Sequence, residues 1–415
     1  MPKSVSFTKG SVIYFAGDID DRVFILQKGS AVATSDDVET KLPVTEQIKN
    51  GEFFGVKSAL GHFPREETVT TPEDSLCISM TVQEFEKIFS SNKQVIMKML
   101  RVFSKQLRQI HSKTEAILNQ GEEINQISGL FSVAQAFYND EKWRSCADVC
   151  LTFLKHYSSS PYAKDAANMY AKANAYVKKG ISSSSPAAEI QAALSESSMQ
   201  VFDLPAFQRF QKTYEDGQVI ITEFENGETF YLIQSGAVQL TKCANNTNKN
   251  LDILKPGEFF GEMAILDNSP RSATCVAMGQ VKCLEFNKEN FELLIGGNPQ
   301  LAIILLKLFC KRIYDQKRRF KTLVIADPQA RLADVFCMLD EMNPSVKFSA
   351  DHSRTFNVTI SDMAHWSGLP QNVVNDEINR FAASRKIEVY EDRMVAANIL
   401  DMRRIVDTKA NQRKI

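Results

Sequence analysis

The sequence predicts a multidomain α+β chain with two β-rich domains, an all-α segment between them and a helix-turn-helix module at the end. Three observations predict this order. A pattern of short strands and turns near the N-terminus returns about 206 residues later. Helical periodicity runs through the segment between the two copies. After the second copy, the chain reads as helix, glycine-containing turn and helix, followed by a hairpin.

The two β-rich copies carry strand and turn signals in the same order. In the first copy these signals cover residues 12–15, 17–21, 23–26 and 29–32. In the second copy they cover residues 217–221, 225–233 and 236–240. Each copy continues into the same five residues, Gly-Glu-Phe-Phe-Gly, at 51–55 and 257–261. A repeated order at a fixed separation indicates an internal duplication.

In the second copy, residues 257–273 have the chemistry of a site for sugar and phosphate. Gly261 allows the backbone to approach a ligand closely because it has no Cβ. The guanidinium fork of Arg271 can grip both exocyclic oxygens of a phosphodiester, whereas the carboxylate of Glu262 can only accept a hydrogen bond, as from a sugar hydroxyl. The alternative interpretation is a β-barrel turn in which these two side chains form an internal salt bridge.

These residues closely resemble the cassette of the cyclic-nucleotide-binding family, which carries Phe-Gly-Glu, a short hydrophobic helix and then Pro-Arg-Ser/Thr-Ala. The resemblance implies that each copy is a jelly-roll β-barrel and that the effector is cAMP or cGMP. It implies that Glu262 takes the ribose 2′-hydroxyl and that Arg271 and Ser272 take the cyclic phosphate. In this family the helix after the barrel commonly closes over the purine. The predicted ligand site comprises Phe260, Gly261, Glu262, Met263, Ala264, Arg271, Ser272, Ala273 and Gln316.

The first copy departs from this pattern at two positions. Val56 replaces the ribose-binding glutamate, and Glu66 replaces the serine that follows the phosphate-binding arginine, here Arg65. A carboxylate beside the site repels phosphate and can pair with Arg65 itself. Three interpretations stay open: a degenerate structural or interface barrel, a site for a non-standard anion at Gly55, Lys57 and Arg65, and ordinary cyclic-nucleotide binding.

Helical periodicity predicts long exit helices over residues 93–120 and 299–320, one after each copy. The first of them can pack on its own barrel or on a partner subunit. Small and aromatic residues alternate in the segment between the copies and resemble a tetratricopeptide-type hairpin, so a helical spacer and a peptide-binding groove are the alternatives. The expected helices of this insert cover residues 127–139, 142–157 and 161–178, with a loop at 181–186.

The C-terminal segment begins with Asp327-Pro328, a strong helix start. After a turn at Asn343-Pro344 and a strand at residues 355–358, Ser361 is expected to cap a helix. Gly368 then makes the turn and Pro370 opens the next helix, before a hairpin. This order and spacing resemble the winged helix of the Crp/Fnr transcription regulators.

The resemblance implies that outward residues of the second helix read DNA bases. The candidates are Gln371, Asn372, Asn375, Asn379 and Arg380. Asn and Gln suit adenine edges, but Asp376 and Glu377 repel phosphates, and acidic and basic residues are equal in number from Lys321 onward. Val374, Ile378 and Phe381 are expected to face the core. Double-stranded DNA and a partner protein are therefore alternative targets.

Composition excludes several function classes. The net charge of −1 provides no global attraction to nucleic acid or acidic membrane, so such binding needs a local patch. No apolar run approaches the roughly 20 residues of a membrane helix, and no signal core is present, so a cytoplasmic protein is expected. The eight cysteines lack CxxC spacing and are expected to be buried thiols, and the five scattered histidines predict no metal site.

Four domains are predicted. Residues 1–120 form a degenerate barrel with its exit helix, 121–200 a helical segment with a linker, 201–320 the nucleotide-binding barrel with a long helix, and 321–415 the winged helix. With no catalytic motif, metal or cofactor expected beyond the effector, the predicted function is a cAMP- or cGMP-responsive, Crp/Fnr-like transcription regulator that acts allosterically through its winged helix. The alternative is a sensor that does not bind DNA and regulates a partner protein. A homodimer is compatible with either function.

Overall fold

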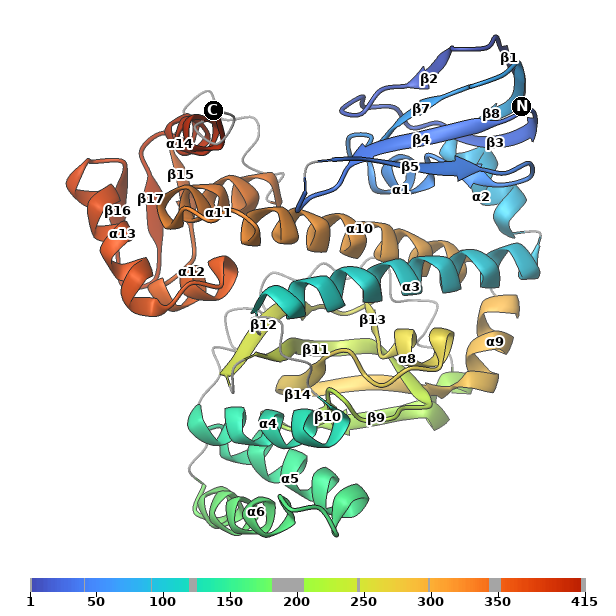
Figure 1. Cartoon of the computed structure of the whole chain (residues 1–415). Coiled ribbons are helices and arrows are strands. Elements are labelled where there is room, and N and C mark those ends of the chain that lie inside the picture. The colour runs from blue at the N-terminus through green and yellow to red at the C-terminus, as the bar shows by residue number, and fades with distance from the viewer. Residues whose placement is uncertain are drawn as a thin grey trace. The chain divides into compact units, whose positions relative to one another are not determined.

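The computed structural model describes residues 2–40, 42–90, 92–118, 125–180, 205–244, 247–297, 299–342 and 352–411 (Figure 1). The chain divides into two compact units. Unit 1 comprises Met1–Ile88 and Cys310–Ile415, and unit 2 comprises Phe89–Phe309. Unit 1 therefore combines the first barrel with the C-terminal module, although these segments lie far apart in the sequence.

The first barrel consists of two antiparallel sheets, with strand orders β1-β8-β3-β6 and β2-β7-β4-β5. Its strands are β1 (Lys3–Phe7), β2 (Val12–Tyr14), β3 (Val23–Lys28), β4 (Ala31–Asp36), β5 (Pro43–Ile48), β6 (Phe53–Phe54), β7 (Thr68–Thr70) and β8 (Ser75–Met80). Its helices are α1 (Val56–Gly61) and α2 (Val82–Ser90). Residues from both sheets, including Tyr14, Phe24, Val69 and Cys77, form one buried core. Alternating apolar residues thus close the two sheets face to face.

The second barrel repeats this topology with longer strands. Its strands are β9 (Gln211–Tyr214), β10 (Val219–Ile221), β11 (Thr229–Ala244), β12 (Thr247–Leu254), β13 (Phe259–Phe260) and β14 (Thr274–Asn287). The order is β10-β14-β11-β12, with β13 on β11 and β9 on β14. Register shifts interrupt the β11–β14 pairing between Ile233 and Ala237. Because such irregularities bend a strand, β11 and β14 can each serve both layers of the barrel.

Strand pairing relates the two barrels residue by residue. Phe24 pairs with Phe54 in the first barrel, as Tyr231 pairs with Phe260 in the second. Tyr231 therefore lies 207 residues after its counterpart Phe24, whereas Phe260 lies 206 residues after its counterpart Phe54. The duplication predicted from the sequence is confirmed, and this one-residue difference decides which side chains correspond near the cassettes.

The insert consists of α4 (Gln126–Asn139), α5 (Trp143–Tyr157) and α6 (Ala163–Lys178), close to the predicted ranges. Helix α4 packs on β11 and β12, and α5 packs on β10 (Figure 1). The buried core of the insert includes Cys243 and Val276, which belong to strands of the second barrel. This shared core fixes the insert to the barrel more firmly than a hinged spacer would require. The loop predicted at residues 181–186 lies outside the described residues.

The remaining helices of unit 2 and of the C-terminal module follow the predicted order. They are α3 (Lys93–Leu118), α9 (Lys288–Gly297), α10 (Pro299–Leu323), α11 (Pro328–Met342), α12 (Ile360–Ser367), α13 (Gln371–Ala383) and α14 (Ile399–Asn411). A short η2 (Pro205–Phe210) precedes the second barrel. Strands β15 (Arg354–Phe356), β16 (Ile387–Val389) and β17 (Met394–Ala396) form a sheet in the order β15-β17-β16. The sequence reasoning did not predict α2, α9 or α14.

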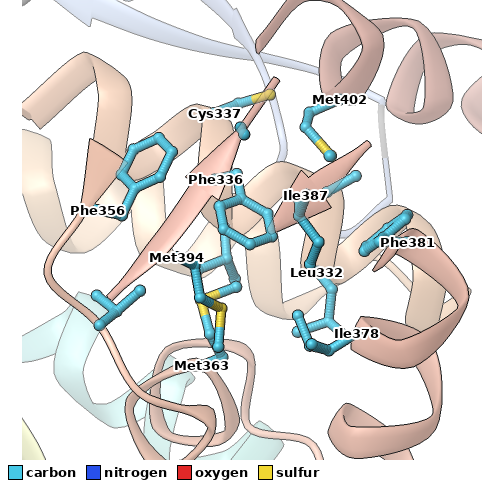
Figure 2. Close-up of a cluster of buried hydrophobic side chains, with 14 of the residues drawn as sticks. Leu332, Phe336, Cys337, Phe356, Met363, Ile378, Phe381, Ile387, Met394 and Met402 are labelled. Atoms are coloured by element: carbon cyan, nitrogen blue, oxygen red, sulfur yellow. The ribbon is translucent and has the colours of Figure 1, made fainter. Parts of the chain in front are cut away.

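One hydrophobic core holds the C-terminal module together (Figure 2). Leu332 and Phe336 of α11 pack with Met363 of α12 and with Ile378 and Phe381 of α13. Val374, Ile378 and Phe381 are buried, as the helical pattern predicts. The helix, turn, helix and hairpin therefore share one apolar interior.

The predicted helix caps of this module are confirmed with one correction. Asp327 accepts a hydrogen bond from the Ala330 N–H at 2.8 Å, and Gly368 ends α12 with φ 66°. Thr359, not Ser361, caps α12, and Asp362 completes a capping box. Thr359 has extended backbone, so its hydroxyl reaches the Asp362 N–H, whereas Ser361 already lies inside the helix. The turn predicted at Asn343-Pro344 lies outside the described residues.

Candidate functional site

The cassette of the second barrel packs its backbone tightly against Arg271. Gly261 lies between β13 and α8 (Glu262–Asp267) with φ 81°, in the left-handed region that favours glycine. A Cβ at Gly261 would stand 2.8 Å from Nη1 of Arg271, so no larger residue fits without moving the guanidinium. The close approach of a ligand to Gly261 stays a prediction.

Arg271 is a buried cation whose hydrogen-bonding capacity is only partly used. Its side chain donates from Nη1 to the Gly261 carbonyl at 2.7 Å and from Nη2 to Thr229 Oγ1 at 3.2 Å. Its Nε is buried and makes no hydrogen bond within the described part of the chain. Burial lowers the pKa of the guanidinium. An anion that reaches this group would therefore relieve both the unpaired N–H and the buried charge.

The backbone of Arg271 is held from both sides. Its N–H donates to the Glu225 carbonyl at 2.8 Å, and its carbonyl accepts from the Phe224 N–H at 3.0 Å. Gly227 lies over the guanidinium, where a Cβ would clash with Nε. These contacts fix where the guanidinium points. Because residue 227 is glycine, no side chain covers the guanidinium at that position.

The other predicted ligand residues surround this arginine. Glu262 is 1% exposed, which places a carboxylate in the buried part of the cassette. Ser272 is half-buried, and its hydroxyl lies 3.7 Å from the sulfur of Met263. Ala264 and Ala273 are buried beside them. Phe260 stacks on Tyr231 in the barrel core, with ring centroids 4.9 Å apart, so it supports the cassette from below.

Gln316 lies on α10, in the part of that helix that belongs to unit 1. Its side-chain Oε1 is buried and accepts no hydrogen bond from the described residues. The contact of Gln316 with a purine stays a prediction.

Within unit 2, the exit helix of the first barrel lies against the second cassette. Helix α3 packs on α8, and Arg108 Nη1 donates to the Pro270 carbonyl at 3.0 Å (Figure 1). Ser104 and Thr114 are buried on α3, and neither hydroxyl makes a hydrogen bond to any described residue. Sequence reasoning offered only the helix's own barrel or a partner subunit. The available signal was three polar residues, Ser104, His111 and Thr114, on the buried face of a helix whose other buried residues are apolar.

The first cassette holds its arginine in a different environment. Arg65 is 2% exposed and donates to the Gly55 carbonyl at 2.6 Å, to Ser58 Oγ at 2.8 Å and to the Arg22 carbonyl at 2.6 Å. A carboxylate oxygen of Asp20 lies 3.4 Å from its Nη2. The ring of Tyr14 lies 4.4 Å from the guanidinium carbon. The charge and the terminal nitrogens of Arg65 therefore have partners inside the barrel, although its Nε, like that of Arg271, makes no hydrogen bond within the described ranges.

Glu66 pairs with lysines, which corrects the expected pairing with Arg65. Its carboxylate lies 3.5 Å from Lys57 and 2.8 Å from Lys317 of α10. Burial alone would raise the pKa of Glu66, but the two lysines outweigh burial and hold the pKa below its usual value. Arg65 instead pairs with Asp20, because that carboxylate follows directly on the turn that binds the arginine backbone.

A second contact joins α10 to the same cassette. Tyr314 stacks on Phe63, with ring centroids 3.9 Å apart and planes 3° from parallel. Both residues belong to unit 1, as do Glu66 and Lys317. The chain's own α10 therefore contacts the loop between α1 and β7 through one aromatic pair and one ion pair.

The candidate DNA-binding residues lie on one surface of α13. Gln371, Asn372, Asn375 and Asn379 are exposed, and so is Asp376. Arg380 is exposed as well, but its Nη1 lies 2.6 Å from a carboxylate oxygen of Glu377. Glu377 was expected to flank the surface, yet it is only 7% exposed, because it lies one turn from the core residues Val374 and Phe381 on α13. The charge of Arg380 is thus largely balanced within its own helix.

All eight cysteines are free and buried, as predicted. Among the residues that the structure describes, no three His, Cys, Asp or Glu side chains are grouped to hold a metal ion. Along the same ranges, no helix has both the length and the apolar character needed to cross a bilayer.

Two segments, residues 4–92 and 211–298, match the family model of the cyclic nucleotide-binding domain. The chain therefore carries two cyclic nucleotide-binding domains. The two matched segments coincide with the two barrels described above and include their cassettes.

Similar proteins are regulators. A cAMP-dependent protein kinase regulatory subunit from Mucor circinelloides f. lusitanicus is 39% identical over 91 residues, which are 22% of this chain and 21% of that protein. A CRP-like cAMP-activated global transcriptional regulator from Mycobacterium tuberculosis is 25% identical over 167 residues, 40% of this chain and 74% of that protein. The chain thus spans about a fifth of the kinase subunit's length and three quarters of the bacterial regulator's.

The chain is also similar to two solved structures. A CRP/FNR-family transcriptional regulator from Thermus thermophilus is 18% identical, with a TM-score of 0.37, and covers 48% of this chain and 99% of its own. A CooA mutant from Carboxydothermus hydrogenoformans is 16% identical, with a TM-score of 0.42, and covers 52% of this chain and 99% of its own.

Proposed function

We propose, from the premise of two cyclic nucleotide-binding domains, that this protein is a regulator controlled by cAMP or cGMP through its second barrel. One observation carries the proposal. Arg271 is buried, its terminal nitrogens donate to the uncharged Gly261 carbonyl and Thr229 hydroxyl, and the buried carboxylate of Glu262 lies in the same cassette. A cyclic nucleotide offers Arg271 an anionic phosphodiester and offers Glu262 a neutral hydroxyl.

Each residue of the cassette then has a separate task. Arg271 binds the exocyclic phosphate oxygens, with Ser272 as a second donor. Glu262 accepts the ribose 2′-hydroxyl, since its charge would repel the phosphate. Gly261 keeps the backbone close to the ligand, and buried Met263, Ala264 and Ala273 shape the apolar wall. The first cassette takes no nucleotide, because Arg65 is occupied by Asp20 and by backbone carbonyls.

The output of the regulator lies in the C-terminal module, which we treat as a winged helix. The sequence continues from the second barrel through α10 into this module. Nucleotide can shift the module only by binding two arrangements of the chain with different affinity. In a Crp/Fnr-like transcription regulator, α13 would enter the major groove, with Gln371, Asn372, Asn375 and Asn379 at base edges and Arg380 nearby.

A specific observation favours a second output. Arg380 is paired with Glu377 at 2.6 Å, and the neighbouring side chain of Asp376 is exposed. Both features weaken the attraction of α13 to phosphates, which supplies most non-specific DNA affinity. An exposed helix with amides and balanced charge suits a protein partner equally well. The alternative function is a cyclic-nucleotide sensor that regulates such a partner.

Two titrations of the full-length chain test these proposals. Calorimetry with cAMP and with cGMP should show saturable binding at one site per chain, and the absence of heat with both nucleotides would refute the proposed effector. Fluorescence anisotropy with selected double-stranded DNA fragments should then show binding that the nucleotide strengthens. No binding at low salt, with or without nucleotide, would leave the partner-regulating function.

A further inference from the structure

One turn holds Arg271 in the second barrel, and it differs from its counterpart in the first barrel. The Phe224 N–H donates to the Arg271 carbonyl at 3.0 Å, just as the Gly17 N–H donates to the Arg65 carbonyl at 2.8 Å. Gly17 has φ 92° and Phe224 has φ 67°. Glycine adopts positive φ readily, whereas a bulky aromatic residue is disfavoured there by its Cβ. The turn that holds Arg271 is therefore strained, and the turn that holds Arg65 is not.

The first turn of α4 supports this strained residue. Gln126 Nε2 donates to the Phe224 carbonyl at 2.7 Å. A Cβ built on Gly129 would stand 2.8 Å from the Phe224 ring, so the ring can pack there only because residue 129 is glycine. Asn125 caps α4 by accepting from two backbone N–H groups, which keeps both supporting residues in regular helix. The first barrel needs no such support, since Gly17 is unstrained.

We propose that helix α4 of the insert is a positioning element for Arg271, acting through the strained turn at Phe224. The insert then sets the affinity of the second cassette although neither Gln126 nor Gly129 touches ligand. This inference rests on the proposed function of Arg271 as the phosphate-binding residue. Linkage requires the converse effect, so that nucleotide binding tightens the contact between α4 and Phe224. The helical insert thereby becomes a site from which nucleotide affinity can be controlled.

A double-mutant cycle between Gly129 and Phe224 tests the proposal by calorimetry with cAMP. Gly129→Ala places a methyl group against the Phe224 ring and should weaken binding about ten-fold, the middle of the range for residues in contact. Phe224→Gly restores the glycine found at Gly17. In that background Gly129→Ala should leave the affinity unchanged. An equal loss in both backgrounds would overturn the proposal.

Gln126→Ala is a milder change than Gly129→Ala, made at a half-buried residue in the first turn of α4. Loss of its hydrogen bond to the Phe224 carbonyl should weaken cAMP binding about five-fold. The matched control is Ser145→Ala, which removes a hydrogen bond of 2.7 Å from α5 to the Gly217 carbonyl of the same barrel. This control should bind cAMP as the wild type does. Equal weakening by both variants would show that general docking of the insert matters, and not the turn at Phe224.

Hydrogen exchange separates failure of this inference from failure of the proposed function. If the wild type binds neither cAMP nor cGMP, the proposed function is wrong, but the amides of Phe224 and Arg271 still report on the turn. Gly129→Ala should accelerate exchange at both amides about ten-fold, because their hydrogen bonds depend on the supported turn. Ser145→Ala should not. Unchanged exchange in Gly129→Ala would overturn the positioning role whether or not nucleotide binds.

Discussion

The two cassettes contain the same arginine, but they give its terminal nitrogens different partners. Arg65 donates to two backbone carbonyls and a serine, and Asp20 lies 3.4 Å from it. Arg271 donates to one carbonyl and one threonine. The Nε of both arginines is without a hydrogen-bond acceptor among the described residues. The presence of a phosphate-binding arginine therefore says little by itself. What matters is whether the barrel already supplies its counter-charge.

The decisive difference lies outside the cassettes themselves. The backbone N–H of Arg65 donates at 2.8 Å to the carbonyl of Asp18, two residues before Asp20. The backbone N–H of Arg271 donates at 2.8 Å to the carbonyl of Glu225, two residues before Gly227. These two positions correspond in space: one carries a carboxylate and the other carries no side chain. If the second barrel alone binds nucleotide, as proposed, a charge in a neighbouring loop distinguishes the two sites as well as a change in the motif does.

The largest expected effect is a loss of nucleotide affinity when Arg271 is replaced, but not when Arg65 is replaced. Arg271→Leu should weaken cyclic-nucleotide binding by about 2 to 5 kcal/mol, the scale for removing one partner of a desolvated charge pair. The matched substitution Arg65→Leu should leave the affinity unchanged. Calorimetry with cAMP measures both. Equal affinity of the Arg271→Leu protein and the wild type would contradict the assignment of the second barrel as the binding barrel.

Gly227→Asp should convert the second cassette toward the first. The new carboxylate would stand beside Arg271, compete with the phosphate and weaken binding by about 2 kcal/mol beyond any steric effect. Gly227→Asn is the control, since it adds nearly the same volume without the charge. Similar affinity for the two variants would show that space, and not charge, explains the difference between the cassettes.

The reverse conversion sharpens the same point. Val56→Glu with Glu66→Ser restores the residues of the motif but leaves Asp20 paired with Arg65. The pair of substitutions alone should keep the stoichiometry at one nucleotide per chain. Adding Asp20→Gly should raise it toward two, as counted by calorimetric titration. A second site in the double variant would show that Asp20 does not silence the first cassette.

A further prediction concerns the exposed surface of α13. If the module reads DNA, Asn375→Ala or Gln371→Ala should reduce discrimination between sequences by about 1 to 3 kcal/mol, the usual value of a base contact. Asp376→Asn should instead tighten binding to all sequences, because it removes repulsion of phosphates. Asn168→Ala, at an exposed position of α6, is the control. Anisotropy titrations that register no change for all three α13 variants would support the protein-partner function.

The smallest expected effect is the pH dependence of the Glu66 contact with Lys317. Because the pKa of folded Glu66 is lowered, its stabilisation is complete above the ordinary glutamate pKa of about 4.3 and is lost as pH falls through the lowered value. Glu66→Gln should cost about 1 kcal/mol of unfolding free energy at neutral pH. That cost should vanish in acid. Denaturant titrations at several pH values measure it, and a pH-independent cost would refute this account of the pair.

The sequence by itself determined the local elements of this protein. The duplication, the helix ranges of the insert and the caps at Asp327 and Gly368 were all predictable, because hydrophobic period, capping and turn chemistry act between near neighbours. The identity of the second cassette was predictable for the same reason, since Gly261, Glu262 and Arg271 lie within one short segment. Even the miss at Thr359 was a local shift of two residues.

Only the tertiary structure decided which distant segments meet. Asp20 occupies the place of Gly227 because the copies differ by one residue before the cassette, and alignment at a fixed separation hides that correspondence. The contact of α3 with α8 and the pairing of Lys317 with Glu66 each join residues far apart in the chain. Such contacts follow from how whole elements pack. Periodicity and motif spacing describe which face of an element is apolar, but not which partner covers it.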